Sequence, residues 1–258
     1  MAGRIVSSVS AACSGALTEN VGWSDASGSP AGVSQTRKQV SDFQLAAVPD
    51  SAWRNVDLVT VTIGGNDAGF GNGLRVCLVI ACESGEARSR ILSAVGGVGP
   101  RLAATYAAIR RRAPRATVVV LGYPQLFPAA GQNEPGCVQG YPRRRQLFLR
   151  GATVRLDQTI AKETRRAGLF FVPVARLFAG HEPCGRKLDW MFGVQHGLTP
   201  ASYHPNATGQ RVYARGLQEF LRCLKTSRWR AGASGLPRNP LPGRAAPSRC
   251  TPDTHPGV

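Results

Sequence analysis

The sequence is poor in acidic residues and almost without lysine. Its 258 residues include 15 Asp and Glu against 32 Lys and Arg, and only four of these are lysines, so the formal net charge is +17. A charge of this size permits nucleic-acid binding. However, the arginine clusters are not interleaved with aromatic residues and match no recognisable DNA-reading motif. These clusters lie at residues 110–112, 143–145 and 165–166. A solvated basic surface explains them better.

Long apolar runs are also missing. No stretch of 18 apolar residues could form a membrane helix, and the opening MAGRIVSSVSAAC lacks the continuous apolar segment of a secretory signal. The hydrophobic content of 43% is nevertheless ordinary for a globular protein. We therefore expect one domain over residues 1–225. Residues 226–258 are rich in Pro, Gly, Ser and Arg and have no apolar periodicity, which predicts a disordered basic tail.

The seven cysteines do not have the sequence spacing of zinc ligands. No C-x-x-C pair occurs, and no histidine lies where a second ligand pair should be, so we expect no metal site and no cofactor. Scattered cysteines suit disulfides and hence an exported protein. Because seven is odd, at least one cysteine is unpaired or has its partner outside this chain. The positions are 13, 77, 82, 137, 184, 223 and 250.

Four segments rich in β-branched residues are expected to be buried strands, at residues 4–8, 56–63, 117–121 and 169–174. Amphipathic helical stripes alternate with them, over residues 102–109, 149–160 and 213–224. Gly168 is expected to cap the second helix and Asn206 to start the third. This alternation predicts an α/β fold with a mostly parallel sheet covered by helices on both faces. Ligands then bind beyond the carboxyl ends of the strands.

The segment Gly64-Gly65-Asn66-Asp67 follows one such strand end, and Gly122-Tyr123-Pro124 follows another. A simple turn would explain the glycines and the amide of the first segment. The alternative is that Asn66 directs its side-chain NH₂ at a developing oxyanion, while the glycines let the backbone pass close to a substrate.

Two further positions could take part in the same chemistry. His204 precedes Pro205, which keeps it out of the following helix and presents its imidazole on a fixed loop, as a general base requires. A single histidine is more often structural. Gly15 follows the first expected strand and could bring a backbone N–H to a ligand.

Taken together, three motifs resemble the SGNH (GDSL-type) esterase and lipase superfamily, in its secreted actinobacterial-type branch. They are the CSGA turn at 13–16, VTIGGND at 61–67 and HPNATG at 204–209. The resemblance spans roughly residues 3–224 and includes LGYPQLFP and FAGHEPC.

The resemblance implies a three-layer α/β/α sheet of flavodoxin type. The Gly15 N–H and the Asn66 amide would bind the oxyanion, and His204 would be the general base. The expected reaction is hydrolysis of a small-molecule or lipid ester through an acyl-enzyme. The family further implies a secreted protein, for which we expect a monomer without a transmembrane segment. Cys77–Cys82 and Cys137–Cys184 would be disulfides, whereas Cys223 and Cys250 stay unassigned.

The sequence departs from the family pattern in two places. The nucleophilic serine of the family lies in a Gly-Asp-Ser segment ahead of the CSGA turn, but no such tripeptide occurs here. Ser51 follows Asp50 without being preceded by a strand, and nothing marks Ser7, Ser8 or Ser14 as activated. The family often places Asp three residues before the histidine, where this sequence has Ala201. Some members orient the histidine with a backbone carbonyl instead.

These departures lead to the hypothesis that the sequence is an N-terminally shortened form of a secreted esterase, without its first strand. An upstream segment would supply a signal peptide, the serine and a partner for Cys13. Losing an interior strand exposes unpaired sheet edges, so we expect the chain as written to be poorly soluble and inactive.

Two other function classes stay open. One is a non-catalytic protein that binds a lipid or glycan on the same scaffold, and the other is a basic nucleic-acid-binding protein, although we expect no nucleic acid as partner. The loops expected to line an ester cleft, at 17–35, 68–86 and 125–142, indicate no acyl-chain preference.

Overall fold

The computed structural model describes residues 7–12, 15–21, 44–137, 139–194, 198–199, 201–226, 236, 238–243 and 250. Three parallel strands form its sheet in the order β1 (Leu58–Val61), β2 (Thr117–Leu121) and β3 (Phe170–Val172). In the register, Val61 lies beside Val120 and Leu121 beside Val172. The three carboxyl ends therefore meet at one edge of the sheet.

Three of the four expected strands are confirmed, with β2 matching residues 117–121 and the others shorter than expected. Of the fourth, at 4–8, only Ser7 and Ser8 belong to the described residues, and neither is in a strand.

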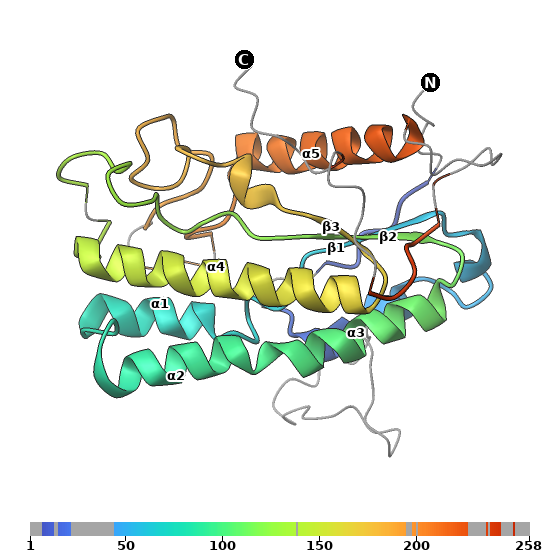
Figure 1. Cartoon of the computed structure of the whole chain (residues 1–258), viewed down its shortest axis with the longest axis horizontal. Coiled ribbons are helices and arrows are strands. Elements are labelled where there is room, and N and C mark those ends of the chain that lie inside the picture. The colour runs from blue at the N-terminus through green and yellow to red at the C-terminus, as the bar shows by residue number, and fades with distance from the viewer. Residues whose placement is uncertain are drawn as a thin grey trace.

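Helices cover both faces of the sheet, which gives the expected three-layer α/β/α arrangement (Figure 1). α3 (Val98–Arg112) and α4 (Arg143–Arg166) lie below the sheet in this view, and α5 (Ala207–Thr226) lies above it. α1 (Phe70–Val79) and α2 (Gly85–Gly96) lie on the side of α3 and α4. Short 3-10 turns occupy Thr18–Val21, Gln44–Ala47, Trp53–Asn55 and Val174–Arg176.

The alternating side chains of β2 divide the core into two layers. All five residues of β2 are buried. Val118 and Val120 pack with residues of α3 and α4, whereas Val119 and Leu121 pack with β3 and α5. Full burial of each such side chain stabilises the fold by about 1.5–3 kcal/mol, so β2 anchors both layers.

The segment 68–86, expected to be a cleft loop, is instead largely helical. α1 occupies Phe70–Val79 and α2 begins at Gly85. Two glycines within α1, Gly71 and Gly73, lower its intrinsic helix propensity. Tertiary contacts overcome this, because Leu74 and Cys77 of α1 are buried against the loops that follow β2 and β3.

Part of the expected tail, residues 238–243, is described and contacts the chain at the start of β2. The Asn239 side chain accepts a hydrogen bond from the Val118 N–H (2.8 Å) and donates one to the Ala116 carbonyl (2.8 Å). The pairing of β2 with β3 begins only at Val119, so Asn239 satisfies one backbone group in β2 and one directly before it. Residues 227–235, 237, 244–249 and 251–258 lie outside the described part of the chain.

None of the helices within the described ranges combines the length and the apolar character that a membrane crossing requires.

Candidate functional site

The turn after β1 is tight, and its two glycines are required by close neighbours. Gly64 has φ +110°, and a Cβ there would lie 3.3 Å from side-chain atoms of both Leu102 and Val98. A Cβ on Gly65 would lie 3.0 Å from the Tyr123 hydroxyl oxygen. The glycines therefore serve close packing at the strand end as well as the turn itself.

Asn66 and the segment around Gly15 lie next to each other. The Asn66 side-chain amide donates a hydrogen bond to the Ala16 carbonyl at 2.9 Å. Gly15 adopts φ +75° and is exposed, as is Asn66. The amide nitrogen carries two hydrogens, and this bond uses one of them. The structure thus places the Asn66 side chain next to the segment that contains Gly15, and the oxyanion-binding role of both residues stays a prediction.

Asp67 connects the Asn66 turn to the segment around Gly15 by hydrogen bonds. Its carboxylate accepts hydrogen bonds from the Thr18 N–H (2.9 Å) and the Thr18 hydroxyl (2.6 Å). The Asp67 side chain is only 2% exposed, with an Arg101 guanidinium nitrogen 3.7 Å away. The Thr105 hydroxyl donates to the Thr18 carbonyl at 3.2 Å. Charge-assisted bonds of this kind hold the Gly15 segment against the Asn66 turn.

His204 stands on a loop whose preceding residue is strongly anchored. Tyr203 has φ +60°, an uncommon conformation for a residue other than glycine, and is 6% exposed. Its ring packs edge-on against Phe127 (centroids 5.3 Å apart) and Tyr141 (6.0 Å apart). The aromatic packing holds the backbone that carries His204, while the imidazole itself is exposed.

The ring of His204 is oriented by the backbone. Nδ1 lies 3.1 Å from the Ser202 carbonyl oxygen. With the proton on Nδ1, this atom donates to that carbonyl and Nε2 is left as the acceptor, which is the tautomer a general base needs. The Ser202 carbonyl therefore orients the ring. Ala201 has no carboxylate with which to do so. Asn206 caps α5, as expected, by accepting from the N–H groups of Thr208 and Gly209.

A hydrogen-bond network at the end of β2 links both halves of the site. The Gly65 N–H donates to the Tyr123 hydroxyl (3.0 Å), and the Tyr123 N–H donates to the Asp157 carboxylate (2.8 Å). From α5, the Tyr213 hydroxyl donates to the Gly122 carbonyl (3.0 Å). The Tyr123 hydroxyl therefore contacts the turn that carries Asn66, and the Gly122 carbonyl contacts the helix that follows His204.

Burial dominates the electrostatics of this network. It raises the pKa of Asp157 to about 7, although the hydrogen bond from the Tyr123 N–H opposes the shift. Burial also raises the pKa of Tyr123 to about 12, and that of Tyr213 well above its ordinary value. Asp157 thus ionises near neutral pH, far above a free carboxyl group.

Sequence reasoning singled out the 122–124 segment only as a strand end and missed Asp157, Asp67 and Thr18. Asp157 could have been noticed in the sequence, because it directly follows Leu156 of the apolar stripe of α4. For Asp67, no pattern separates this carboxylate from an ordinary turn residue.

The candidate nucleophiles stay unassigned. Ser7 and Ser8 are exposed and lie in no helix or strand, whereas Ser14 and Cys13 lie outside the described residues. A surface hollow of about 610 Å³ is lined by none of the candidate catalytic residues. Its walls come from the loops at 134–135 and 185–189. It adjoins the histidine loop, since the Asn206 amide donates to the Asp189 carbonyl at 2.8 Å.

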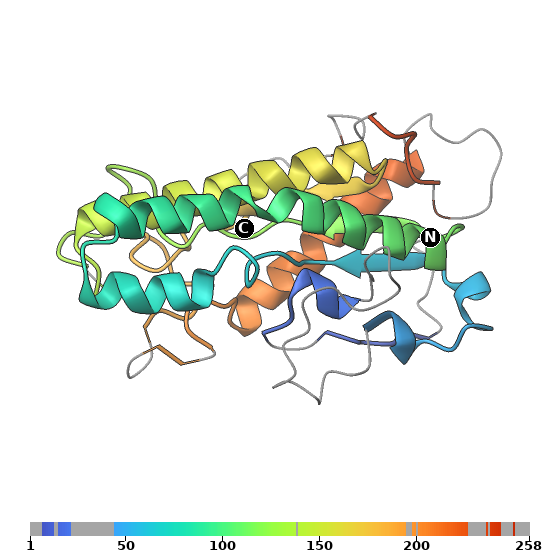
Figure 2. The same cartoon turned by 90° about the horizontal axis from the view of Figure 1, so that it is seen from below.

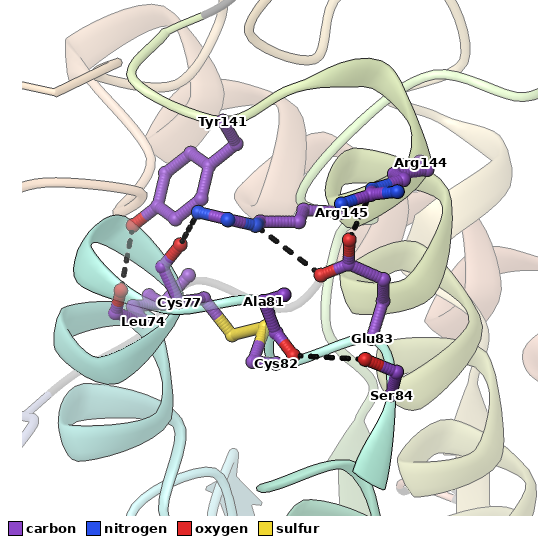
Figure 3. The surroundings of a disulfide bond; sticks show 9 residues. All are labelled: Leu74, Cys77, Ala81, Cys82, Glu83, Ser84, Tyr141, Arg144 and Arg145. Atoms are coloured by element: carbon purple, nitrogen blue, oxygen red, sulfur yellow. Dashed lines mark hydrogen bonds and ion pairs between the residues drawn. A yellow bond between two sulfur atoms is a disulfide. The ribbon is translucent and has the colours of Figure 1, made fainter.

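Three disulfides brace the loops of the structure. Cys77–Cys82 and Cys137–Cys184 confirm the two expected pairs, and Cys223–Cys250 adds a third. Figure 3 shows the first, where the chain passes from α1 to α2. Arg145 reaches over it and donates to the Cys77 carbonyl (2.8 Å) and to Glu83 (3.2 Å). The Tyr141 hydroxyl donates to the Leu74 carbonyl at 3.0 Å.

The profile of the GDSL-like Lipase/Acylhydrolase family matches residues 2–212 of this chain. The chain belongs to the GDSL-like lipase and acylhydrolase family. Its expected GGND and HPNATG segments are the turn and the histidine loop described above. The resemblance that the sequence motifs indicated is therefore confirmed.

Proteins similar to this GDSL-like chain come from Streptomyces. A lipase of Streptomyces rimosus is 36% identical over 157 residues, which cover 60% of this chain and 56% of that protein. Lipase 2 of Streptomyces coelicolor is 29% identical over 202 residues, or 71% of this chain and 68% of the relative. The chain thus spans little more than half the length of the S. rimosus lipase.

Solved structures show the same fold. Phospholipase A1 from Streptomyces albidoflavus NA297 aligns with a TM-score of 0.58 at 29% identity, covering 79% of this chain and 77% of that one. The extracellular lipase from Streptomyces rimosus aligns with a TM-score of 0.57, at the same identity and coverage. The α/β fold of the GDSL-like family is thereby confirmed for this chain.

Proposed function

We propose that this chain carries the oxyanion-binding and general-base groups of a serine-type carboxylic ester hydrolase. The observation that supports the proposal most is the hydrogen bond between the Asn66 amide and the Ala16 carbonyl, which sets an amide donor beside the Gly15 backbone. His204, oriented by the Ser202 carbonyl, would be the base. The lipases and the phospholipase A1 among its relatives support a lipid ester as substrate.

In the proposed reaction, Nε2 of His204 accepts the proton of a serine hydroxyl as its oxygen attacks the ester carbonyl. The carbonyl π electrons move to oxygen, and the Gly15 N–H and the free N–H of Asn66 stabilise this oxyanion. The oxyanion electrons then re-form the carbonyl, the ester C–O bond breaks, and His204 gives its proton to the leaving alcohol, which leaves an acyl-serine. Water next attacks the acyl carbon while His204 accepts its proton, and collapse of this second intermediate breaks the bond to serine and returns the proton to the serine oxygen, releasing the acid.

No Gly-Asp-Ser tripeptide occurs in the 258 residues, so the proposal includes no named nucleophile within them. We expect the 258-residue chain by itself to hydrolyse esters slowly or not at all. The same chain preceded by its in-frame upstream codons is expected to be active if those codons encode the serine segment. An extended chain that carries such a serine segment and still does not hydrolyse esters would refute this expectation.

Hydrolysis of short p-nitrophenyl esters by the active form tests the site. Removing an oxyanion donor costs about 10²–10³ in kcat, which we expect for Asn66→Ala, and His204→Ala should cost at least as much. His181→Ala is the matched control, because His181 stacks on Trp190 with centroids 3.4 Å apart and has no proposed role. Activity that survived both Asn66→Ala and His204→Ala would overturn the assignment.

A second candidate function is non-catalytic binding of a lipid or glycan on the same scaffold. The absence of a Gly-Asp-Ser segment favours it. Calorimetric binding of an ester that the upstream-extended chain leaves intact would support this function over hydrolysis.

We also propose that the protein is exported to an oxidising compartment. The three disulfides support this proposal, because such bonds persist mainly outside the cytosol. A monomer is proposed as well, and light scattering would test it.

A further inference from the structure

Asp157 is a carboxylate on α4 that the proposed reaction does not use. It approaches the carboxyl end of β2, where it accepts the Tyr123 N–H at 2.8 Å. A Cβ added to Gly122 would lie 3.0 Å from the same carboxylate oxygen and 3.0 Å from the Phe171 ring. The carboxylate is therefore in close contact with the backbone at the end of β2, with no room between them for another side chain.

The dipeptide Gly122-Tyr123, whose backbone Asp157 holds, contacts both halves of the candidate site. The Tyr123 hydroxyl accepts the Gly65 N–H, one residue before Asn66. The Gly122 carbonyl accepts the Tyr213 hydroxyl from the helix that follows His204. Two segments far apart in the sequence thus take their position from one dipeptide.

We propose that Asp157 is a positioning residue for the candidate active site, which fixes the backbone of Gly122 and Tyr123 and thereby the placement of Asn66 relative to His204. This role rests on the proposed function, since it presupposes that these two residues act together. Misplacement of a catalytic group by about 1 Å can cost roughly 10²-fold in rate, so a distant support of this kind matters.

Among the described residues, three tyrosine hydroxyls interact electrostatically with Asp157. They come from Tyr106 on α3, Tyr123 after β2 and Tyr213 on α5, and burial raises the pKa of each. Asp157 itself has its pKa raised from 3.8 to about 7. Below pH 7 the folded protein holds it neutral, so its contribution to stability is full below about pH 4 and is lost as the pH rises through 7.

The first test is amide hydrogen exchange of the 258-residue chain, which needs no catalysis. We expect Asp157→Ala to speed exchange of the Gly65 amide at least tenfold, because the Tyr123 hydroxyl is no longer held in place. Glu163→Ala is the matched control, since Glu163 also lies on α4, with a side chain 8% exposed. Equal exchange at Gly65 in the two variants would overturn the proposal.

The second test separates positioning from general packing. Asp157→Asn keeps an oxygen that can accept the Tyr123 N–H, so protection of Gly65 should be restored to within about threefold of wild type. The Tyr123 amide resonance should titrate with a midpoint near pH 7 in wild type and lose this transition in the variant. An unchanged titration in Asp157→Asn would assign it to another group and refute the role.

A third variant keeps the proposal testable should Asp157→Ala fail to fold. Tyr123→Phe removes only the hydroxyl that accepts the Gly65 N–H, and we expect the same acceleration at Gly65. Unchanged exchange would contradict the network. In a form that hydrolyses esters, Asp157→Ala should lower kcat about tenfold with KM unchanged. If the exchange changes but the upstream-extended chain does not hydrolyse esters, the proposed function is refuted and the hydrogen-bond network still stands.

Discussion

The strand-end network and the corner between α1 and α2 are held by different means. At the strand ends, hydrogen bonds among Gly65, Tyr123 and Asp157 join backbone to half-buried side chains. At the corner, a disulfide and Arg145 fix a short connection (Figure 3). The first arrangement rests on hydrogen bonds alone, whereas the second includes a covalent bond that reduction would break. A candidate catalytic region thus keeps adjustable contacts, while a peripheral loop is locked covalently.

The largest expected loss in the free energy of unfolding follows removal of the Cys137–Cys184 disulfide, which lies outside the corner between α1 and α2. Cys137–Cys184 closes a loop with a sequence separation of 47, against 5 for Cys77–Cys82. Loop entropy then predicts a loss of about 4 kcal/mol for the double Ser variant of the former and about 2 kcal/mol for the latter. Urea unfolding of both double variants tests this order. Equal losses would show that covalent bracing at the corner matters more than loop length.

An intermediate effect is expected from adding a methyl group at the strand ends. In Gly122→Ala the new Cβ would lie 3.0 Å from both the Asp157 carboxylate and the Phe171 ring. We expect a loss of about 2 kcal/mol in the free energy of unfolding, as for other overpacked sites. Gly151→Ala on α4 is the control, because its added Cβ meets nothing within 4 Å. A loss no greater than that of the control would mean that the strand ends are as adaptable as the surface.

The smallest expected effect separates two neighbouring arginines at the corner. Arg145→Ala removes the donor to the Cys77 carbonyl, from a side chain only 14% exposed, and should cost about 1–2 kcal/mol. Arg144 pairs with the same Glu83 from a side chain 73% exposed, so Arg144→Ala should change thermal stability little. Similar melting temperatures for the two variants would show that the carbonyl contact is unimportant.

Much of the scaffold could be predicted because its signals are local. β2 is a continuous apolar run, and the helices over 98–112, 143–166 and 207–226 carry clear apolar stripes. α1 could not be predicted in this way, because its glycines argue against a helix and only its burial against distant loops stabilises it.

Part of the candidate site could be predicted from the sequence for a related reason. Asn66 and His204 stand in motifs, whereas Asp157 acquires its role only when α4 lies against the end of β2. Sequence also gave no indication that the Asn66 amide would share its hydrogens with Ala16. Such pairings depend on contacts over 30 or more residues, which local patterns do not record.

Figure 2 shows the molecule from below, with the segment 238–243 near the ends of α4 and α5. Gly168, which ends the α4 turn with φ +63°, is crossed by this segment so closely that a Cβ would lie 2.6 Å from the Pro240 carbonyl oxygen. One glycine thus satisfies two separate demands, a left-handed cap and a crossing of two backbones. Its replacement in an evolving lineage would require a change in the C-terminal segment as well, so these two distant stretches of the gene are expected to vary together.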